Sequence, residues 1–387
     1  MNLLTSTSLR RWFLTLLAAS VAPAAAIMKM LLLGFLAVAS LRAVAFADEP
    51  YQWTGTELIE LAARAPAALR APLVTVVDKP QVSPSGDAHD YVSFARYYWP
   101  DPSKPDGLPY VSHDGRHNEE QVARGDHKRL GQFAENVGAL AAAWKIKHDE
   151  AAARRAGEWL RVWLITPATR MKPALDFAQI RLGRDQNRGS PSGVLDARGF
   201  GDVIDALLLL HDSPAFAPGD EAAIHAWFKT YLDWLITARN AKAEHAAKNN
   251  HGSWFLAQII PIARYSGRDD LARALCEEDK QRIASQIKPD GSQPEEIRRV
   301  DGLGYSAFNM EAQFHVARLA SGLGVDLWNY TAPTGASLRR ALDYLRPFNL
   351  RPESWPTTQN AKLKNGFLDP LLAQGRSVWP DFSTSAK

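Results

Sequence analysis

The sequence predicts an all-α protein, a single domain of paired antiparallel helices arranged as an (α/α) toroid. Apolar residues recur at three- and four-residue steps over most of residues 118–387, and almost no segment alternates with period two. Short clusters of Gly, Pro and Asp separate the helical stretches. No fixed-period repeat is present, but helical hairpins every ~45–60 residues would suit a ring of helix pairs. No break in composition divides this region, so we expect one domain rather than two.

Residues 1–47 have the pattern of an export signal. Two segments in which basic residues precede an apolar run follow each other, and the second ends at Ala45-Phe46-Ala47, a small-x-small cleavage signal. Three interpretations remain open: a true start at Met28, one longer signal peptide, or a twin-arginine signal around Arg10-Arg11. All three predict export, so we expect a periplasmic or secreted protein that begins at Asp48. Neither apolar run suits a stable membrane span of about 20 residues.

Residues 48–117 are expected to form an N-terminal arm and a loop rich in proline and aromatic residues. Seven prolines lie in residues 71–118, with tyrosine and tryptophan residues between them. A second irregular stretch, residues 183–199, is rich in Gly, Arg and Asn. Segments of this length inside a compact domain either wrap the body or cover a site. Both possibilities stay open from the sequence.

The helical region, residues 118–387, follows this arm. Its first apolar stripe consists of Leu130, Phe133, Val137, Leu140 and Trp144, and the pattern resumes over residues 159–163 after a break near residue 149. Turn residues bound each later stretch, as Pro289-Asp290-Gly291 does. The further helices are expected at residues 202–210, 221–237, 252–265, 269–285, 306–323 and 338–345.

Charge and cysteine content exclude several classes of protein. The chain has 45 basic and 42 acidic residues, but four of the basic residues and no acid lie in residues 1–47. The remainder therefore carries 41 basic against 42 acidic residues, a net charge of −1, which removes the main electrostatic support for nucleic-acid binding. The single cysteine, Cys276, permits no intramolecular disulfide, and no Cys/His cluster has zinc spacing. We expect a monomer that uses neither metal nor cofactor.

The most unusual hexapeptide, Asn249-Asn250-His251-Gly252-Ser253-Trp254, stands where a helix is expected to begin. Adjacent Asn residues and a Gly propagate a helix poorly. One interpretation is an N-cap in which His251 is incidental. The other is functional, because an amide beside an imidazole supplies a donor for an anion and a titratable base. On a helix, Trp254 shares a face with Asn250, and Gln258 with His251.

A second cluster, Gln293-Pro294-Glu295-Glu296-Ile297-Arg298-Arg299, precedes a helix headed by Tyr305. Glu-Arg runs are usually solvated, and a Tyr that enters a helix usually packs against its neighbours. Together with Asn250 and His251, however, these residue types suit removal of a proton next to a carboxylate. Arg and Asn neutralise the charge that develops on the carboxylate oxygens, while Tyr or His moves the proton.

These two clusters resemble the alginate lyase domain of α/α-toroid polysaccharide lyases. The upstream block Tyr98-Trp99-Pro100-Asp101-Pro102, with residues 107–110 and Asp114-Gly115, also matches. The resemblance spans about residues 90–350 and is closer to the glucuronan and mannuronan lyase branch. It implies cleavage of an anionic polysaccharide, a 4-linked polyuronate such as alginate, polymannuronate or glucuronan. The reaction it implies is β-elimination, which leaves an unsaturated uronate end.

The resemblance also implies roles for single residues. Asn250 and Arg299 would neutralise the carboxylate, and His251 and Tyr305 would move protons. Counting back from Tyr305 puts Arg298 in the neutralising role instead, and this alternative stays open. The expected substrate contacts are Gln179, Trp254, Gln258 and Arg298.

Two other functions fit a chain of this kind. An inverting glycoside hydrolase on the same fold needs two carboxyl groups roughly 6.5–9.5 Å apart across a sugar. Glu295, Glu296 and Asp301 offer carboxylates, but the first two are adjacent, and one of them is expected to support Arg299. A non-catalytic periplasmic polysaccharide-binding protein would bind without forming product, and it leaves the pairing of His251 with Tyr305 unexplained.

Overall fold

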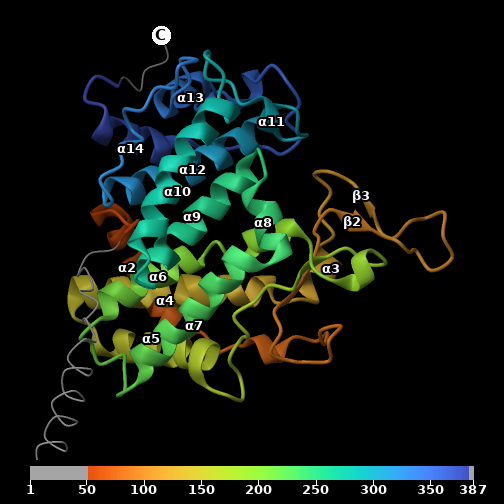
Figure 1. Cartoon of the computed structure of the whole chain (residues 1–387), viewed down its shortest axis with the longest axis vertical. Helices are drawn as coiled ribbons and strands as arrows, with labels where there is room; N and C mark the ends of the chain where they lie inside the picture. Colours follow the sequence, from red (N-terminus) through yellow and green to blue (C-terminus); the bar gives the residue numbers. More distant parts are fainter. Residues whose placement is uncertain (1–50, 383–387) are drawn as a thin grey trace, which may run out of the picture. The chain divides into compact units, whose positions relative to one another are not determined.

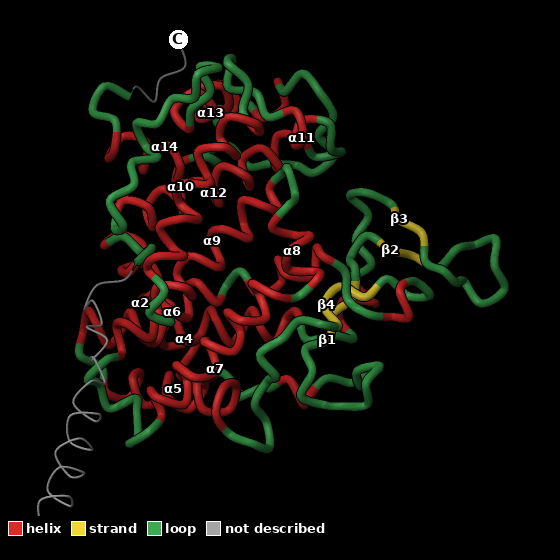
Figure 2. Tube along the Cα trace, in the orientation of Figure 1, coloured by secondary structure: helices red, strands yellow, loops and turns green. Residues whose placement is uncertain are grey.

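The computed structural model describes residues 51–382, and the expected signal segment, residues 1–47, lies outside them. Helices dominate the described chain and form the expected (α/α) toroid, with a few short strands (Figures 1 and 2). The α-helices are α2 (Gly55–Arg70), α3 (Glu119–Ala123), α4 (His127–Lys147), α5 (Glu150–Leu160), α6 (Phe200–Leu210), α7 (Asp220–Thr237), α8 (Arg239–His245), α9 (Asn250–Tyr265), α10 (Asp269–Gln286), α11 (Pro294–Ile297), α12 (Gly302–Ser321), α13 (Leu338–Leu345) and α14 (Asp369–Val378).

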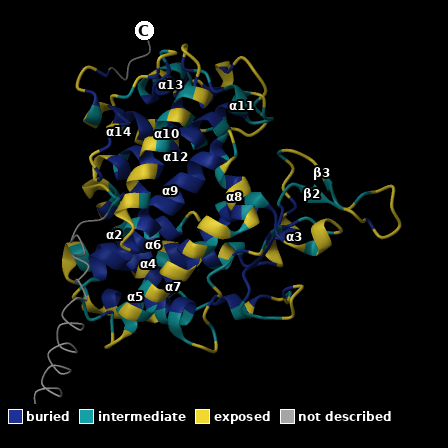
Figure 3. Ribbon diagram, in the orientation of Figure 1, coloured by how far each residue is buried: buried dark blue, intermediate teal, exposed yellow. Residues whose placement is uncertain are grey.

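The core forms where apolar faces of neighbouring helices meet. Leu130, Phe133, Val137 and Leu140, which belong to the predicted stripe, are buried on α4, which packs against α2, α5 and α6. Helix α9 is apolar around most of its circumference, so it is stable only when neighbours cover it on all sides. Helices α6, α7, α10 and α12 contact it, and Figure 3 shows it as almost wholly buried.

The expected helices are confirmed, with differences at their ends. Helix α9 begins at Asn250 rather than Gly252, and α12 begins at Gly302 rather than Ser306. Each first turn contains glycine, which has low helix propensity, so propensity places the start of the helix too late. Helices α2, α8, α11 and α14 were not expected. Helix α2 lies in the expected arm, where Pro66 interrupts the helical pattern, but a capping box between Thr54 and Glu57 starts it and α4 covers it.

Short strands hold the irregular segments beside the helices (Figure 2). Strand β1 (Val92–Phe94) pairs in parallel with β4 (Phe177–Ile180), and β2 (Tyr98–Trp99) pairs antiparallel with β3 (Val111–Ser112). Residues 71–118, expected as a loop, therefore carry β1, β2 and β3. No helix among residues 51–382 is long and apolar enough to cross a membrane.

Candidate active site

A pocket of about 360 Å³ lies where the strands meet the first turns of α9 and α12. The segment 95–98 and β4 supply one side, and a 3-10 helix at Pro191–Ala197 supplies another. Five of the residues expected from the sequence line it: Gln179, Asn250, His251, Arg299 and Tyr305. Segments far apart in the chain thus bring an amide, an imidazole, a guanidinium and a phenol together.

Asn250 is fixed by a buried carboxylate. Its backbone N–H donates to Oε1 of Glu296 and its Nδ2 donates to Oε2, each over 2.6 Å. Burial raises the pKa of Glu296, although the hydrogen bonds from Asn250 oppose this shift. Glu296 therefore supports Asn250, which corrects the expectation that one of the two adjacent glutamates supports Arg299. One N–H of the Asn250 amide remains for a ligand in the pocket.

His251 has a carboxylate partner as well. Its Nδ1 lies 2.5 Å from Oε1 of Glu244, which is buried near the end of α8. The neighbouring His245 uses Nε2 to contact Glu278 and does not line the pocket. The two histidines therefore contact different carboxylates. No group of three or more His, Cys, Asp or Glu residues that could hold a metal ion is found within residues 51–382.

Arg299 connects the pocket to an acidic partner from the strand segment. Its Nε donates to Oδ2 of Asp114 over 2.9 Å, and its Nη2 donates to Oδ1 over 2.6 Å. The same Nη2 lies 2.9 Å from Oη of Tyr305. The hydrogen bond lowers the pKa of Asp114 and raises the pKa of Arg299, so the pair is ionised. Asp114, rather than a glutamate of α11, supports Arg299.

Tyr305 lies between Arg299 and Tyr97, whose hydroxyl is 2.7 Å from its own. Because the guanidinium can only donate, the Tyr305 proton is free to point to Oη of Tyr97. Burial raises the pKa of Tyr305 above its ordinary value, the contact with Tyr97 raises it further, and the charge of Arg299 offsets this only in part. Burial therefore outweighs the stabilisation that the charge of Arg299 gives to the phenolate. Tyr305 therefore holds its proton at neutral pH.

Gln179 faces the pocket in a strained conformation. Its φ is +50°, a left-handed value that is uncommon for residues other than glycine. Its Nε2 donates to Asp196 over 2.8 Å, and its Oε1 accepts from Ser192 over 2.9 Å. Burial alone would raise the pKa of Asp196, but hydrogen bonds, that of His127 foremost, outweigh it and lower the pKa. Such strain persists only where its surroundings enforce it, and it clusters at functional sites.

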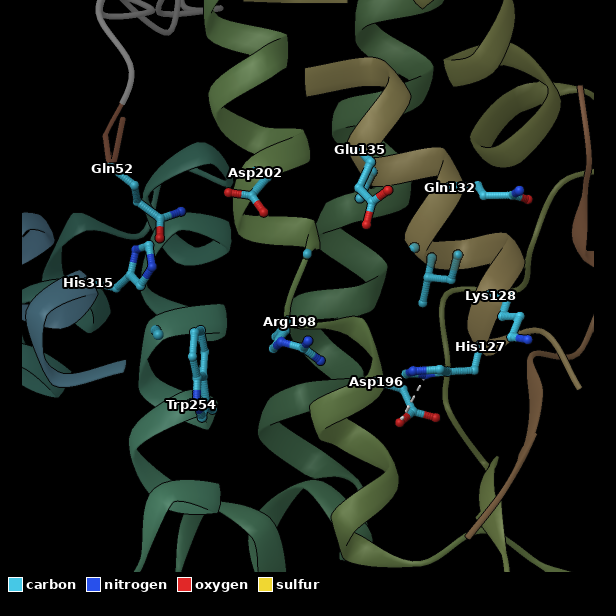
Figure 4. Close-up of a pocket in the computed structure, with 15 residues that line it drawn as sticks. Gln52, His127, Lys128, Gln132, Glu135, Asp196, Arg198, Asp202, Trp254 and His315 are labelled. Carbon is cyan, nitrogen blue, oxygen red and sulfur yellow. Dashed lines mark ion pairs between the residues drawn. The ribbon is translucent and has the colours of Figure 1, made fainter. Parts of the chain in front are cut away.

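Three expected substrate contacts lie elsewhere. Trp254 lines an adjoining cavity of about 610 Å³, shown in Figure 4. Gln258 is buried, accepts from Tyr231 and donates to the backbone of the 3-10 helix, and it lines neither cavity. The side chain of Arg298 is 67% exposed and pairs with Glu295 outside the pocket. Of the two candidate arginines, the pocket therefore contains Arg299.

The two cavities adjoin at Asp196 and Arg198, which line both. In Figure 4, Arg198 stands between Trp254 on one side and the His127–Asp196 pair on the other. Its guanidinium carbon is 5.8 Å from the ring centroids of both Trp254 and Phe308. The cavities therefore offer a polyanionic chain a path that includes a cation and aromatic surfaces.

Sequence reasoning missed the residues that position the others. Tyr97, Asp114, Glu244 and Asp196 all contact a residue of the pocket through hydrogen bonds or ion pairs. Tyr97 and Asp114 lie in or beside the upstream block that matched the family, which was an available signal. The two other carboxylates are buried, and a sequence shows neither which Glu or Asp is buried nor what faces it.

Comparisons with known proteins identify a family and a fold. The family model described as alginate lyase matches residues 75–355. An alginate lyase from Bacteroides ovatus is similar in structure, with a TM-score of 0.80, 36% sequence identity, and coverage of 84% of this chain and 86% of that chain. Alginate lyase A1-III from Sphingomonas species A1 shares the fold, with a TM-score of 0.56, 16% identity, and coverage of 88% and 91%.

A variant of the same Sphingomonas enzyme, in which a histidine is replaced by alanine, has been solved in complex with a tetrasaccharide. It matches with a TM-score of 0.53, 17% identity, and coverage of 89% of this chain and 90% of that chain. A search of curated proteins returns no match.

Proposed function

This chain belongs to the alginate lyase family, and from that premise we propose that it is a polysaccharide lyase that cleaves a 4-linked polyuronate by β-elimination. The observation that carries the proposal is the convergence of Asn250, His251, Arg299 and Tyr305 in one pocket. The substrate classes we propose are alginate, including polymannuronate, and glucuronan. Cleavage would leave an unsaturated uronate at the new chain end.

The difficult step in this reaction is the removal of the C5 proton, because negative charge develops on the neighbouring carboxylate. Arg299 and the free N–H of Asn250 would neutralise that charge. Both are held before substrate arrives, Arg299 by Asp114 and Asn250 by Glu296, so little reorganisation accompanies the reaction. No metal ion is needed for this role, and we expect turnover to survive treatment with a chelator.

Proton transfer would be divided between Tyr305 and His251. Tyr305 holds its proton and is placed to donate it to the leaving oxygen at C4. In mannuronate and glucuronate units, the C5 hydrogen and the C4 oxygen lie on the same face of the ring. One Tyr could serve both steps there only as the phenolate, with its own proton lost to solvent beforehand and the anion stabilised by Arg299; it would then take the C5 proton and return it to the leaving oxygen. In guluronate, the C5 epimer, the C5 hydrogen and the C4 oxygen lie on opposite faces, and His251 would act as the base.

The main alternative is an inverting glycoside hydrolase, which needs a free acid and a free base on opposite sides of a sugar. The carboxylates nearest to the pocket already accept hydrogen bonds from neighbouring side chains, so none is a free acid or base. Glu296 accepts two hydrogen bonds from Asn250, and Asp114 accepts two from Arg299. Asp196 is buried and accepts hydrogen bonds from Tyr91, Ser93 and Gln179. These hydrogen bonds favour the lyase over the hydrolase.

One experiment separates the three functions. The purified protein is incubated with polymannuronate, polyguluronate, glucuronan and a neutral glucan while ultraviolet absorbance is recorded. A lyase produces a conjugated double bond and therefore increasing absorbance on at least one polyuronate. New reducing ends without absorbance would indicate a hydrolase, and saturable binding without either product would indicate a binding protein.

A further inference from the structure

Glu244 and His251 lie on either side of the turn between α8 and α9. Glu244 is 3% exposed, whereas the His251 side chain is 23% exposed and lines the pocket. The 2.5 Å contact joins Oε1 of Glu244 to Nδ1 of His251. An ionised carboxylate can only accept a hydrogen bond, so Nδ1 must carry the proton. In a neutral imidazole, Nε2 on the opposite edge of the ring is then the acceptor.

The turn that holds this pair is itself fixed. The guanidinium of Arg282 donates to the carbonyl oxygens of His245 and Ala247, the latter over 2.9 Å. At Gly252, a Cβ atom would lie 2.2 Å from the oxygen of Ala247 and 2.2 Å from Nη1 of Arg282, so only glycine allows the turn to approach α9 this closely. The carboxylate therefore meets His251 in a preset geometry.

We propose that Glu244 is a positioning residue, which keeps the proton of His251 on Nδ1 and presents Nε2 to the substrate as a proton acceptor. The tautomer is a property of the folded protein, and only the use of Nε2 as a base rests on the proposed function. When Nε2 takes a proton, the carboxylate also stabilises the imidazolium that forms. In Glu244→Gln the side chain can donate as well as accept, so Nδ1 is no longer required to carry the proton, and the tautomer protonated on Nε2, which lacks the acceptor, becomes more populated.

A second His–Glu pair provides a matched control. His245 contacts Glu278 through Nε2 at 2.9 Å and lies outside the pocket. Glu278→Gln removes the same charge at a similar contact, and its side chain is partly exposed. If the effect of Glu244→Gln came only from the loss of one negative charge or from general loosening of α8, Glu278→Gln would reproduce it.

The tautomer is measured by nitrogen NMR of protein labelled at its ten histidine rings, with His251→Ala used to assign the signal. We expect Nδ1 of His251 to be protonated and Nε2 to be the acceptor in the wild type and in Glu278→Gln. In Glu244→Gln the fraction of His251 protonated on Nε2 should rise. A wild-type His251 protonated on Nε2, or a tautomer unchanged by Glu244→Gln, would overturn the proposal. This measurement needs no substrate.

The kinetic consequence is measured separately on polymannuronate and polyguluronate. On each polymer, Glu244→Gln should lower kcat in proportion to the loss in His251→Ala, by about 100-fold or more where His251 is the base, with KM nearly unchanged. Glu244→Asp keeps the charge and should retain more activity. A loss in Glu244→Gln on a polymer that His251→Ala still cleaves normally would contradict the proposal. Absence of turnover on every polyuronate would instead overturn the proposed function, and the tautomer would still decide the role of Glu244.

Discussion

Replacing Arg299 by lysine tests whether one guanidinium organises the pocket. Arg299 makes two hydrogen bonds to Asp114 and one to Tyr305, and a lysine ammonium cannot reproduce this fork. A hydrogen bond to a charged group contributes about 1.5–3 kcal/mol. The side chain of Asp114 is 35% exposed, so solvent screening reduces the loss on that side to about 1 kcal/mol. Adding about 2 kcal/mol for Tyr305 gives about 3 kcal/mol for the interactions that hold the guanidinium in place. We expect a misplaced ammonium to lose transition-state stabilisation of the same size, which lowers kcat/KM roughly 100-fold.

The adjacent arginine is the control for this substitution. Arg298 is largely exposed and pairs only with Glu295, so Arg298→Lys should change kcat/KM by less than about twofold. Both variants are compared by initial rates of ultraviolet absorbance on the best polyuronate, with thermal unfolding measured to confirm that each is folded. Equal losses in the two variants, or a larger loss in Arg298→Lys, would refute the assignment of the neutralising role to Arg299.

Three further predictions concern stability and maturation. Gly252→Ala should lower the free energy of unfolding, measured with denaturant, by about 1–3 kcal/mol, because the added Cβ has no room. Gly131→Ala, in open space on α4, is the control and should be neutral or stabilise the protein by up to ~1 kcal/mol. Equal effects of the two substitutions would contradict this prediction. Burial raises the pKa of Asp279 from 3.8 to about 7, so its contribution to stability is complete below its unfolded pKa and is lost as pH rises through about 7. Asp279→Asn should therefore make the free energy of unfolding fall less steeply between about pH 4 and 7, by up to ~1.4 kcal/mol per pH unit, and an unchanged slope would disprove the cause. We also propose that the chain is exported and begins at Asp48, which N-terminal sequencing of protein from its host would test; a soluble cytoplasmic form that retains residues 28–47 would oppose it.

Much of the fold could be predicted because its main signals are local. The apolar stripe of α4 follows from a period of 3.6 residues, the long apolar run predicts the buried α9, and Gly, Pro and Asp clusters end the helices. Helix α2 was not predicted because Pro66 interrupts its helical pattern. Its formation depends on packing against α4, which the local sequence does not show. The two-residue strands depend on partners distant in sequence, and no local pattern reveals them.

The residues of the site also fall into two groups, those that a local motif identifies and those that depend on distant partners. Asn250, His251, Arg299 and Tyr305 belong to unusual local motifs, so the sequence could single them out, and they meet in one pocket. Their supporting residues could not be assigned. The partner of Arg299 is 185 positions away, and the glutamate nearest in sequence to Arg299 serves Asn250 instead. The pKa of Tyr305 likewise depends on burial, which outweighs the nearby positive charge.

The most direct test of the proposed chemistry is Tyr305→Phe, which removes one hydroxyl and leaves the ring in place. That hydroxyl contacts Arg299 and Tyr97 and would deliver the proton to the leaving oxygen. Turnover is measured by ultraviolet absorbance on each polyuronate that the wild type cleaves, and binding of the same polymer is measured by calorimetry. The proposed mechanism predicts loss of turnover on every substrate with binding nearly unchanged. Turnover close to that of the wild type would contradict it and remove Tyr305 from the mechanism.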